Sequence, residues 1–137
     1  MKTNIKLLLA ITCLIMLVSC SKDKEKLEIV SGDYEWVYAV NITASSGVDD
    51  KIITWEESND RYGLTIEENG KLFFFKNGLE EGRYKISEFG NNSDGNYFIY
   101  KYKTTPFKNS YYYVYYTENS LLLNGLMDYS QSYFKKK

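Results

Sequence analysis

The stretch Tyr62-Gly63-Leu64-Thr65-Ile66-Glu67-Glu68-Asn69-Gly70-Lys71-Leu72-Phe73-Phe74-Phe75-Lys76 carries the clearest fold signal of the chain. Apolar residues recur at every second position on both sides of Asn69-Gly70, as they do in half-buried strands. Asn-Gly tolerates the positive φ angles that the tightest hairpin turns need. The β-branched and aromatic residues on either side favour strands. The sequence therefore predicts a β-hairpin over residues 62–76.

The same alternation recurs on both sides of this hairpin, and Asn77-Gly78 is a second turn of the same kind. Residues 44–50 and 90–96 are expected to be loops. Further strands are expected over residues 34–40, 83–87, 97–103, 111–116, 120–123 and 129–134. Residues 51–56 have strand propensity too, and the alternative for them is part of a longer irregular crossover. Such a series predicts an all-β fold: an up-and-down antiparallel meander that closes into a barrel of about eight strands. Closure is expected because open sheet edges recruit other chains.

Large side chains are expected inside this barrel. Period-two alternation places Trp36, Tyr38 and Val40 on one face of the first strand. An eight-stranded barrel is just wide enough for side chains to fill it or for one small ligand. We therefore expect a mostly filled interior with at most a shallow mouth. The large rings expected to face inward are Trp36, Tyr38, Tyr62, Phe74 and Tyr84.

The chain contains no histidine and only two cysteines, Cys13 and Cys20. This composition excludes Ser-His-Asp and Cys-His catalysis and every histidine-ligated metal site. The acidic doublets, such as Glu67-Glu68, join residues that point to opposite faces of a strand, so they are not ready pairs for glycoside hydrolysis. We expect a non-enzymatic protein without a metal or a cofactor, and an enzyme based on carboxylates is the weakest alternative.

The N-terminus has the pattern of a secretion signal. Lys2 and Lys6 precede an apolar run from Leu7 to Val18, and small Ser19 then precedes Cys20. The run has about a dozen residues, whereas a membrane-spanning helix needs roughly 20. Two alternatives stay open: an uncleaved membrane helix, and ordinary cleavage that leaves Cys20 as a free thiol.

The tetrad Leu17-Val18-Ser19-Cys20 resembles the lipobox of bacterial lipoproteins. The resemblance implies cleavage before Cys20 and acylation of that residue, with two or three chains that anchor the protein permanently in a membrane. It also implies the outer membrane, on its periplasmic or its surface face, because Ser21 rather than Asp follows the cysteine. The expected organisation is a signal peptide over residues 1–19, a lipidated cysteine with a charged tether over residues 20–32, and a barrel over residues 33–137. As a flexible segment, the tether would reach roughly 18 Å.

A second resemblance covers Asp33 to Lys137. The segments Tyr34-Glu35-Trp36, Glu68 to Phe74, Ser120 to Leu123 and Tyr133-Phe134-Lys135 are similar to those of small lipocalin-like lipoproteins of Gram-negative bacteria. The resemblance implies a lipocalin-like barrel in which Trp36 plugs one end. It also implies a small apolar or glycan ligand at the mouth of the barrel, in contact with Trp36.

The block Tyr111-Tyr112-Tyr113-Val114-Tyr115-Tyr116 is the densest aromatic run of the chain. Val114 indicates the inner face of this strand, so Tyr111, Tyr113 and Tyr115 are expected to stand in a row outside. Exposed tyrosines stack on sugars or anchor a protein partner. The alternative is ordinary cross-strand packing on a solvated sheet.

The net charge excludes one class of partner. Removal of Lys2 and Lys6 with the signal leaves 15 cationic and 18 anionic side chains, a net charge of −3. This balance is too weakly charged and too mixed for nucleic acid. The expected partners are the membrane, through the lipid on Cys20, and either a small ligand or an envelope protein. An apolar pocket of roughly 300 Å³ or more would favour the ligand, and a solid core with an exposed tyrosine face would favour the protein partner.

Overall fold

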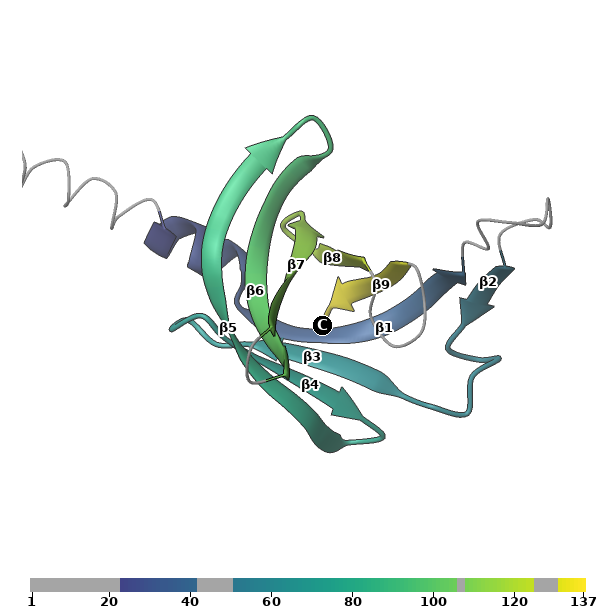
Figure 1. Ribbon diagram of the computed structural model, residues 1–137. Helices are drawn as coiled ribbons and strands as arrows, with labels where there is room; N and C mark the ends of the chain where they lie inside the picture. Colours follow the sequence, from purple (N-terminus) through teal and green to yellow (C-terminus); the bar gives the residue numbers. More distant parts are fainter. Residues whose placement is uncertain (1–22, 42–50, 106–107, 125–130) are drawn as a thin grey trace, which may run out of the picture.

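The structure is a computed structural model, which describes residues 23–41, 51–105, 108–124 and 131–137. Every strand pairing in it is antiparallel, and each strand from β3 onward pairs with the next one in the sequence. The last strand, β9, pairs with β1, so eight strands close into a barrel and β2 is an additional strand. This confirms the predicted all-β meander and its closure (Figure 1). The strands are β1 (Gly32–Asn41), β2 (Lys51–Thr54), β3 (Tyr62–Ile66), β4 (Lys71–Lys76), β5 (Leu79–Asn92), β6 (Gly95–Thr105), β7 (Lys108–Tyr116), β8 (Ser120–Asn124) and β9 (Gln131–Lys136).

One edge of β1 is shared by two short strands. Its first half, Gly32 to Glu35, pairs with β3, and its second half, Tyr38 to Asn41, pairs with β2. Both partners run antiparallel to β1, so β2 and β3 are two parts of one interrupted strand. Residues 55–61 leave the sheet between them. The strand that we expected over residues 51–56 therefore ends at Thr54.

The facing of β1 differs from the prediction in its second half. Tyr34 and Trp36 are buried in the barrel, but the register with β9 shifts between Trp36 and Tyr38. A bulge adds one residue to a strand, and one residue reverses the facing of all that follow. Ala39 is consequently inside, whereas Tyr38 and Val40 share the outer face. The prediction that Tyr38 faces inward was wrong, because a period-two pattern in the sequence does not reveal a bulge.

A continuous apolar core occupies the barrel. Trp36, Tyr62, Phe74 and Tyr84 contribute to it, as the alternation predicts. Phe74, Tyr84 and Tyr100 contact one another, with ring centroids 5.3–5.8 Å apart. The buried members of the core are Val30, Tyr34, Trp36, Ala39, Leu64, Ile66, Leu72, Phe74, Phe98, Tyr100, Val114, Tyr116, Leu121, Leu123 and Phe134.

Residues 23–30 form a helix beside the start of β1 (Figure 1), where we expected a flexible tether. An isolated helix of this length is marginal in water, so its contacts with the barrel must stabilise it. Val30 is fully buried in the core, and its carbonyl accepts a hydrogen bond of 2.8 Å from the Tyr34 hydroxyl. Lys136 Nζ donates to the Ile29 carbonyl across 3.0 Å. Within the described residues, no helix has the length and apolarity needed to cross a membrane.

The region expected as a polar loop over residues 90–96 is instead the tip of a hairpin. β5 continues to Asn92 and β6 begins at Gly95, so only two residues lie between the strands. The Asn92 side chain accepts a hydrogen bond of 2.9 Å from the backbone N–H of Asp94, which stabilises the tight turn. This hairpin extends beyond the body of the barrel (Figure 1).

Candidate functional site

The three tyrosines of β7 stand on the outer face of the barrel, as the alternation predicts. Tyr111 is 58% exposed and Tyr113 is 44% exposed, whereas Val114, which points to the inner face of the strand, is fully buried. Tyr115 is half-buried, and its hydroxyl accepts a hydrogen bond of 3.1 Å from Asn92 Nδ2 on the β5–β6 hairpin. The outward row is therefore confirmed, while a binding role for it stays a prediction.

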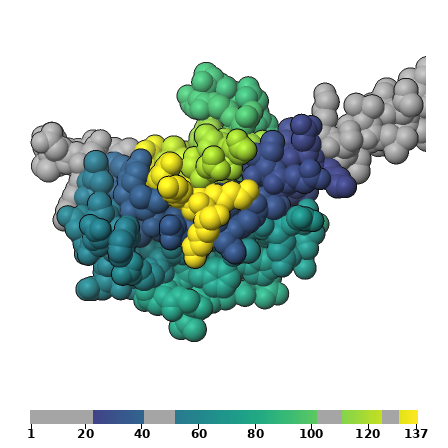
Figure 2. Space-filling model, turned by 180° about the vertical axis from the view of Figure 1, so that it is seen from behind, coloured from purple at the N-terminus to yellow at the C-terminus, as the bar shows by residue number. Residues whose placement is uncertain are grey.

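Tyr115 belongs to a larger outer feature that runs across five strands. In register, Tyr38 of β1 pairs with Tyr133 of β9, Tyr133 with Leu122 of β8, Leu122 with Tyr115 of β7, and Tyr115 with Tyr97 of β6. We name these five residues the aromatic ladder. The ladder crosses four strand spacings, a span of roughly 19 Å at about 4.8 Å each. Figure 2 shows part of this side of the barrel, with β9 in yellow close to β8 in lime and β1 in blue.

Ring contacts order both ends of the aromatic ladder. Tyr38 and Tyr133 stack with centroids 5.1 Å apart. At the other end, Tyr97 lies 6.0 Å from Tyr115 and 5.2 Å from Tyr113. Aromatic pairs of this kind contribute beyond their buried area, and they hold each ring in one orientation.

Gly90 of β5 is opposite Tyr97 and explains how that ring lies flat on the sheet. A Cβ atom at residue 90 would collide with the Tyr97 ring and hydroxyl. Glycine is the residue that allows such a close approach within a strand. The glycine therefore has a packing role in this strand.

Two hollows lie on either side of Tyr115. One has a volume of about 630 Å³ and extends from the β5–β6 hairpin to Tyr38 and Val40 on β1. The other has a volume of about 450 Å³ and lies between Asn92, Tyr111 and Asn124. Among the described residues, their polar lining consists of amide and hydroxyl groups with one carboxylate, Asp94, and no cationic side chain. Uncharged hydrogen-bonding groups beside flat rings suit a neutral, hydroxyl-rich ligand.

Trp36, the fourth candidate contact residue, lies apart from the aromatic ladder. Its side chain is 4% exposed inside the barrel, edge-on to Tyr62 at a centroid distance of 5.4 Å. It lines a separate hollow of about 410 Å³ together with Trp55 and Arg61. The structure thus brings Tyr111, Tyr113 and Tyr115 together on the outer face. It places Trp36 inside the barrel, beside a different hollow.

Sequence reasoning missed four members of the aromatic ladder: Tyr38, Tyr97, Leu122 and Tyr133. Their cross-strand register joins residues up to 95 positions apart, which no local pattern contains. Alternation around buried Phe98 and Phe134 does indicate that Tyr97 and Tyr133 face outward. For Tyr38, the bulge in β1 removes that signal.

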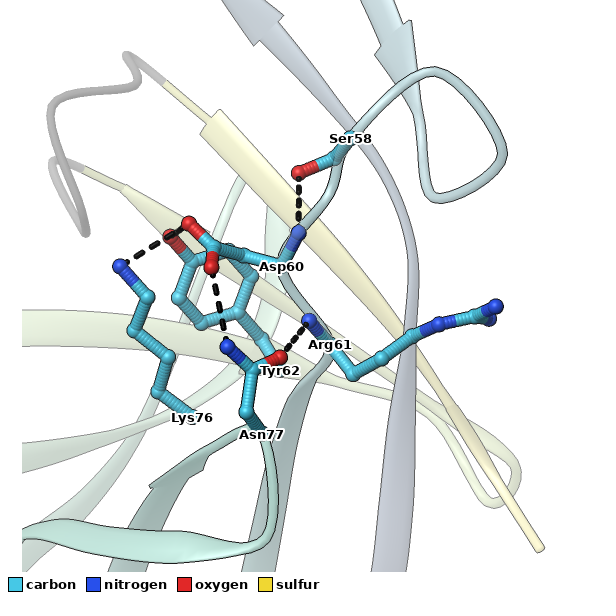
Figure 3. A network of polar contacts seen from close by, with 6 residues as sticks. All are labelled: Ser58, Asp60, Arg61, Tyr62, Lys76 and Asn77. Carbon is cyan, nitrogen blue, oxygen red and sulfur yellow. Dashed lines mark hydrogen bonds and ion pairs between the residues drawn. The ribbon is translucent and has the colours of Figure 1, made fainter.

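Charged and polar groups near the interrupted strand form a hydrogen-bonded network around Asp60. Hydrogen bonds from the Lys76 ammonium and the Asn77 amide hold the pKa of the Asp60 carboxyl below its usual value (Figure 3). The same contact with Asp60 raises the pKa of Lys76. Within the described residues, no three carboxylate or thiol groups lie close enough together to hold a metal ion.

Cys20 and the expected signal peptide over residues 1–19 lie outside the described residues, so both stay predictions. The chain was compared with protein-family models, with curated proteins and with solved structures, and none of the three comparisons gave a significant match.

Proposed function

We propose that this protein is a non-enzymatic, lipid-anchored envelope lipoprotein that binds a neutral glycan chain along the aromatic ladder. The observation that carries the proposal is the in-register series Tyr38, Tyr133, Leu122, Tyr115 and Tyr97, with a hollow on each side of Tyr115. An extended row of this kind suits a linear ligand better than a compact one.

The chemistry of the face supports a sugar as the ligand. The apolar C–H faces of sugar rings pack on aromatic rings, and tyrosine offers a rigid ring with a polar hydroxyl at its edge. Asn96, Ser120 and Gln131 line the larger hollow and can exchange hydrogen bonds with sugar hydroxyls. A charged ligand would leave its charge unpaired here, because the described lining residues include no cation and a single carboxylate.

The location of the ligand differs from the one that the lipocalin-like resemblance implies. A packed cluster of large side chains occupies the barrel, and the two hollows beside Tyr115 lie on the outer face. A barrel filled in this way supports binding outside it rather than transport inside it. The filled barrel with exposed rings such as Tyr111 is what we expected for a protein partner, whereas the hollows of about 630 and 450 Å³ beside Tyr115 are what we expected for a ligand. A protein partner is therefore the alternative occupant of the same face.

The binding test replaces Tyr111, Tyr113 and Tyr115 by serine together. Binding of neutral oligosaccharides of about four units, measured by calorimetry on a panel of linear glycans, is expected to weaken more than about tenfold, because exposed aromatic anchors carry most of the affinity of such a face. The Tm is expected to fall only moderately, because the variant loses the Tyr97 ring contacts with Tyr113 and Tyr115 but no fully buried ring.

The matched control replaces Phe73 and Phe75, two half-buried rings on the outer face of β4, by serine. This variant should keep the affinity of the unmodified protein. Glycan affinity that survives the triple tyrosine change would refute the proposal. A large fall in Tm would also refute it, because the three rings would then stabilise the fold instead of binding a ligand. The alternative, a protein partner, would be established by two results together. No glycan of the panel binds, and a partner protein binds the wild type but not the triple serine variant.

The lipid anchor has a separate test. Cells that express the full chain and are fed an alkyne analogue of palmitate are expected to label the wild-type protein, and Cys20→Ala is expected to carry no label, because the acylated sulfur and the cleavage site are then lost. Label that persists in Cys20→Ala would disprove the anchor, while glycan binding by the same variant would show that the two roles are independent.

A further inference from the structure

The interruption between β2 and β3 creates a hollow that is separate from the aromatic ladder. It has a volume of about 410 Å³, within the range of small-molecule sites. Its apolar side is formed by Trp36, Trp55 and Tyr62. Its other lining residues are Glu35, Val37, Arg61, Lys135 and Lys137.

The loop that carries Trp55 and Arg61 is held in place by contacts outside the hollow (Figure 3). Asp60 accepts hydrogen bonds from Lys76 Nζ at 2.9 Å and from Asn77 Nδ2 at 3.0 Å. The Asn77 side chain in turn accepts a hydrogen bond of 2.7 Å from the backbone N–H of Arg61, and the Asn77 N–H donates to the Arg61 carbonyl at 2.6 Å. The network thus engages only backbone atoms of Arg61, whose side chain points away from it.

The Arg61 guanidinium lies 4.0 Å from the centre of the Trp55 ring. Among the described residues, no carboxylate forms an ion pair with it. Arg83 offers a direct contrast, because its guanidinium also lies over a ring, that of Phe73 at 5.0 Å, but is neutralised by Glu80 at 3.2 Å. The guanidinium N–H groups of Arg61 are therefore available to a ligand, whereas those of Arg83 donate to Glu80.

The hollow is positive in a chain that is negative overall. Among its described lining residues, the cationic side chains of Arg61, Lys135 and Lys137 face a single acidic side chain, that of Glu35, whereas the whole chain has a net charge of −1. An arginine that stacks on an aromatic ring keeps its edge donors available for bidentate contact with a carboxylate or phosphate group.

We propose that this hollow binds a small organic anion, a carboxylate or phosphate carried on a flat ring. Arg61 and Lys135 bind the anionic group, and the ring packs against Trp55 and Tyr62. The two-part lining favours such a ligand over a free inorganic anion, which would leave the aromatic side unused, and over a neutral ring, which would leave the cations unpaired.

The chain offers its own reporter for this site. It contains two tryptophans, Trp36 and Trp55, and both line the hollow. Titration of the full chain with phenyl phosphate or with benzoate is expected to give a saturable change in tryptophan fluorescence with at least one of the two. Inorganic phosphate and phenol should bind more weakly than the better of the two probes, since each has only one half of the ligand.

Substitution of the arginine separates this site from nonspecific attraction. Arg61→Gln is expected to weaken the affinity about tenfold, as the loss of a hydrogen bond between charged groups does. The fold should be kept, because the Asp60 network contacts only the backbone of Arg61. Arg83→Gln is the matched control and should leave the affinity unchanged. Arg61→Lys, which keeps the charge, should fall between Arg61→Gln and the wild type.

Three results would overturn the proposal: no saturable signal from either probe at millimolar concentration, equal affinity in Arg61→Gln and wild type, or equal losses in the Arg61 and Arg83 variants. The triple serine variant of Tyr111, Tyr113 and Tyr115 should keep the fluorescence titration intact. Failure of the glycan proposal and failure of this one are thereby distinguishable.

Discussion

Replacement of Phe134 by alanine is expected to lower the free energy of unfolding by about 3–5 kcal/mol, the usual cost of truncating a buried phenylalanine. Phe134 is fully buried on β9, the strand that closes the barrel. Its register partners, Trp36 on β1 and Leu121 on β8, are buried as well, so the cavity would open between both neighbours of the closing strand. Domains have only about 5–15 kcal/mol of stability in total, so the variant should be partly unfolded in mild urea.

The matched control for this experiment is the adjacent residue. Tyr133 is on the same strand but on the outer face, where its ring stacks on Tyr38. Tyr133→Ala should cost about 1 kcal/mol, the contribution of one aromatic pair. Urea unfolding followed by circular dichroism measures both values at 25 °C. Equal losses at the two positions would show that the facing of β9 is incorrectly assigned.

Alkaline pH is expected to destabilise the fold through Tyr34. Burial raises the pKa of its hydroxyl from the ordinary value of 10.0 to about 12. Between these two values the unfolded chain loses the proton while the folded chain keeps it, so the unfolded state binds fewer protons. The free energy of unfolding is therefore fully kept below pH 10 and should fall by up to about 3 kcal/mol as the pH rises to 12.

Tyr34→Phe identifies the group responsible for this pH dependence. The variant loses the hydrogen bond to the Val30 carbonyl, which should cost about 1 kcal/mol at neutral pH. It should also lose the part of the alkaline fall in stability that Tyr34 causes, whereas the part due to Tyr116, whose pKa burial raises as well, should remain. Tyr111→Phe, at an exposed ring, serves as the matched control. A pH profile that is the same in wild type and Tyr34→Phe would rule out Tyr34 as the cause.

The hairpin over residues 62–76 shows how much of the fold local sequence contains. Strands β3 and β4 lie where alternation indicates them, and Gly70 adopts the positive φ of 80° that the Asn-Gly turn implies. The same rule correctly assigns Tyr111, Tyr113 and Tyr115 to the outer face of β7. In each case the information is local, because the side chains of a strand alternate between its two faces.

Three features of the candidate sites depend on contacts that no local pattern contains. The bulge between Trp36 and Tyr38 adds Tyr38 to the aromatic ladder, and the interruption before Tyr62 opens the positive hollow. The helix of residues 23–30 depends on residues far along the chain, because Val30 is buried in the core and Lys136 donates to the Ile29 carbonyl.

Local sequence predicts the strand content, a meander that closes, the outward facing of the tyrosine row on β7 and the lack of imidazole chemistry. These properties follow from residue identity and from a period of two, which act over a few neighbouring residues. The folded barrel is needed to see which outward rings share one register line and which cations surround one hollow. Register between distant strands depends on bulges and on packing inside the closed barrel, and these are properties of the whole sheet.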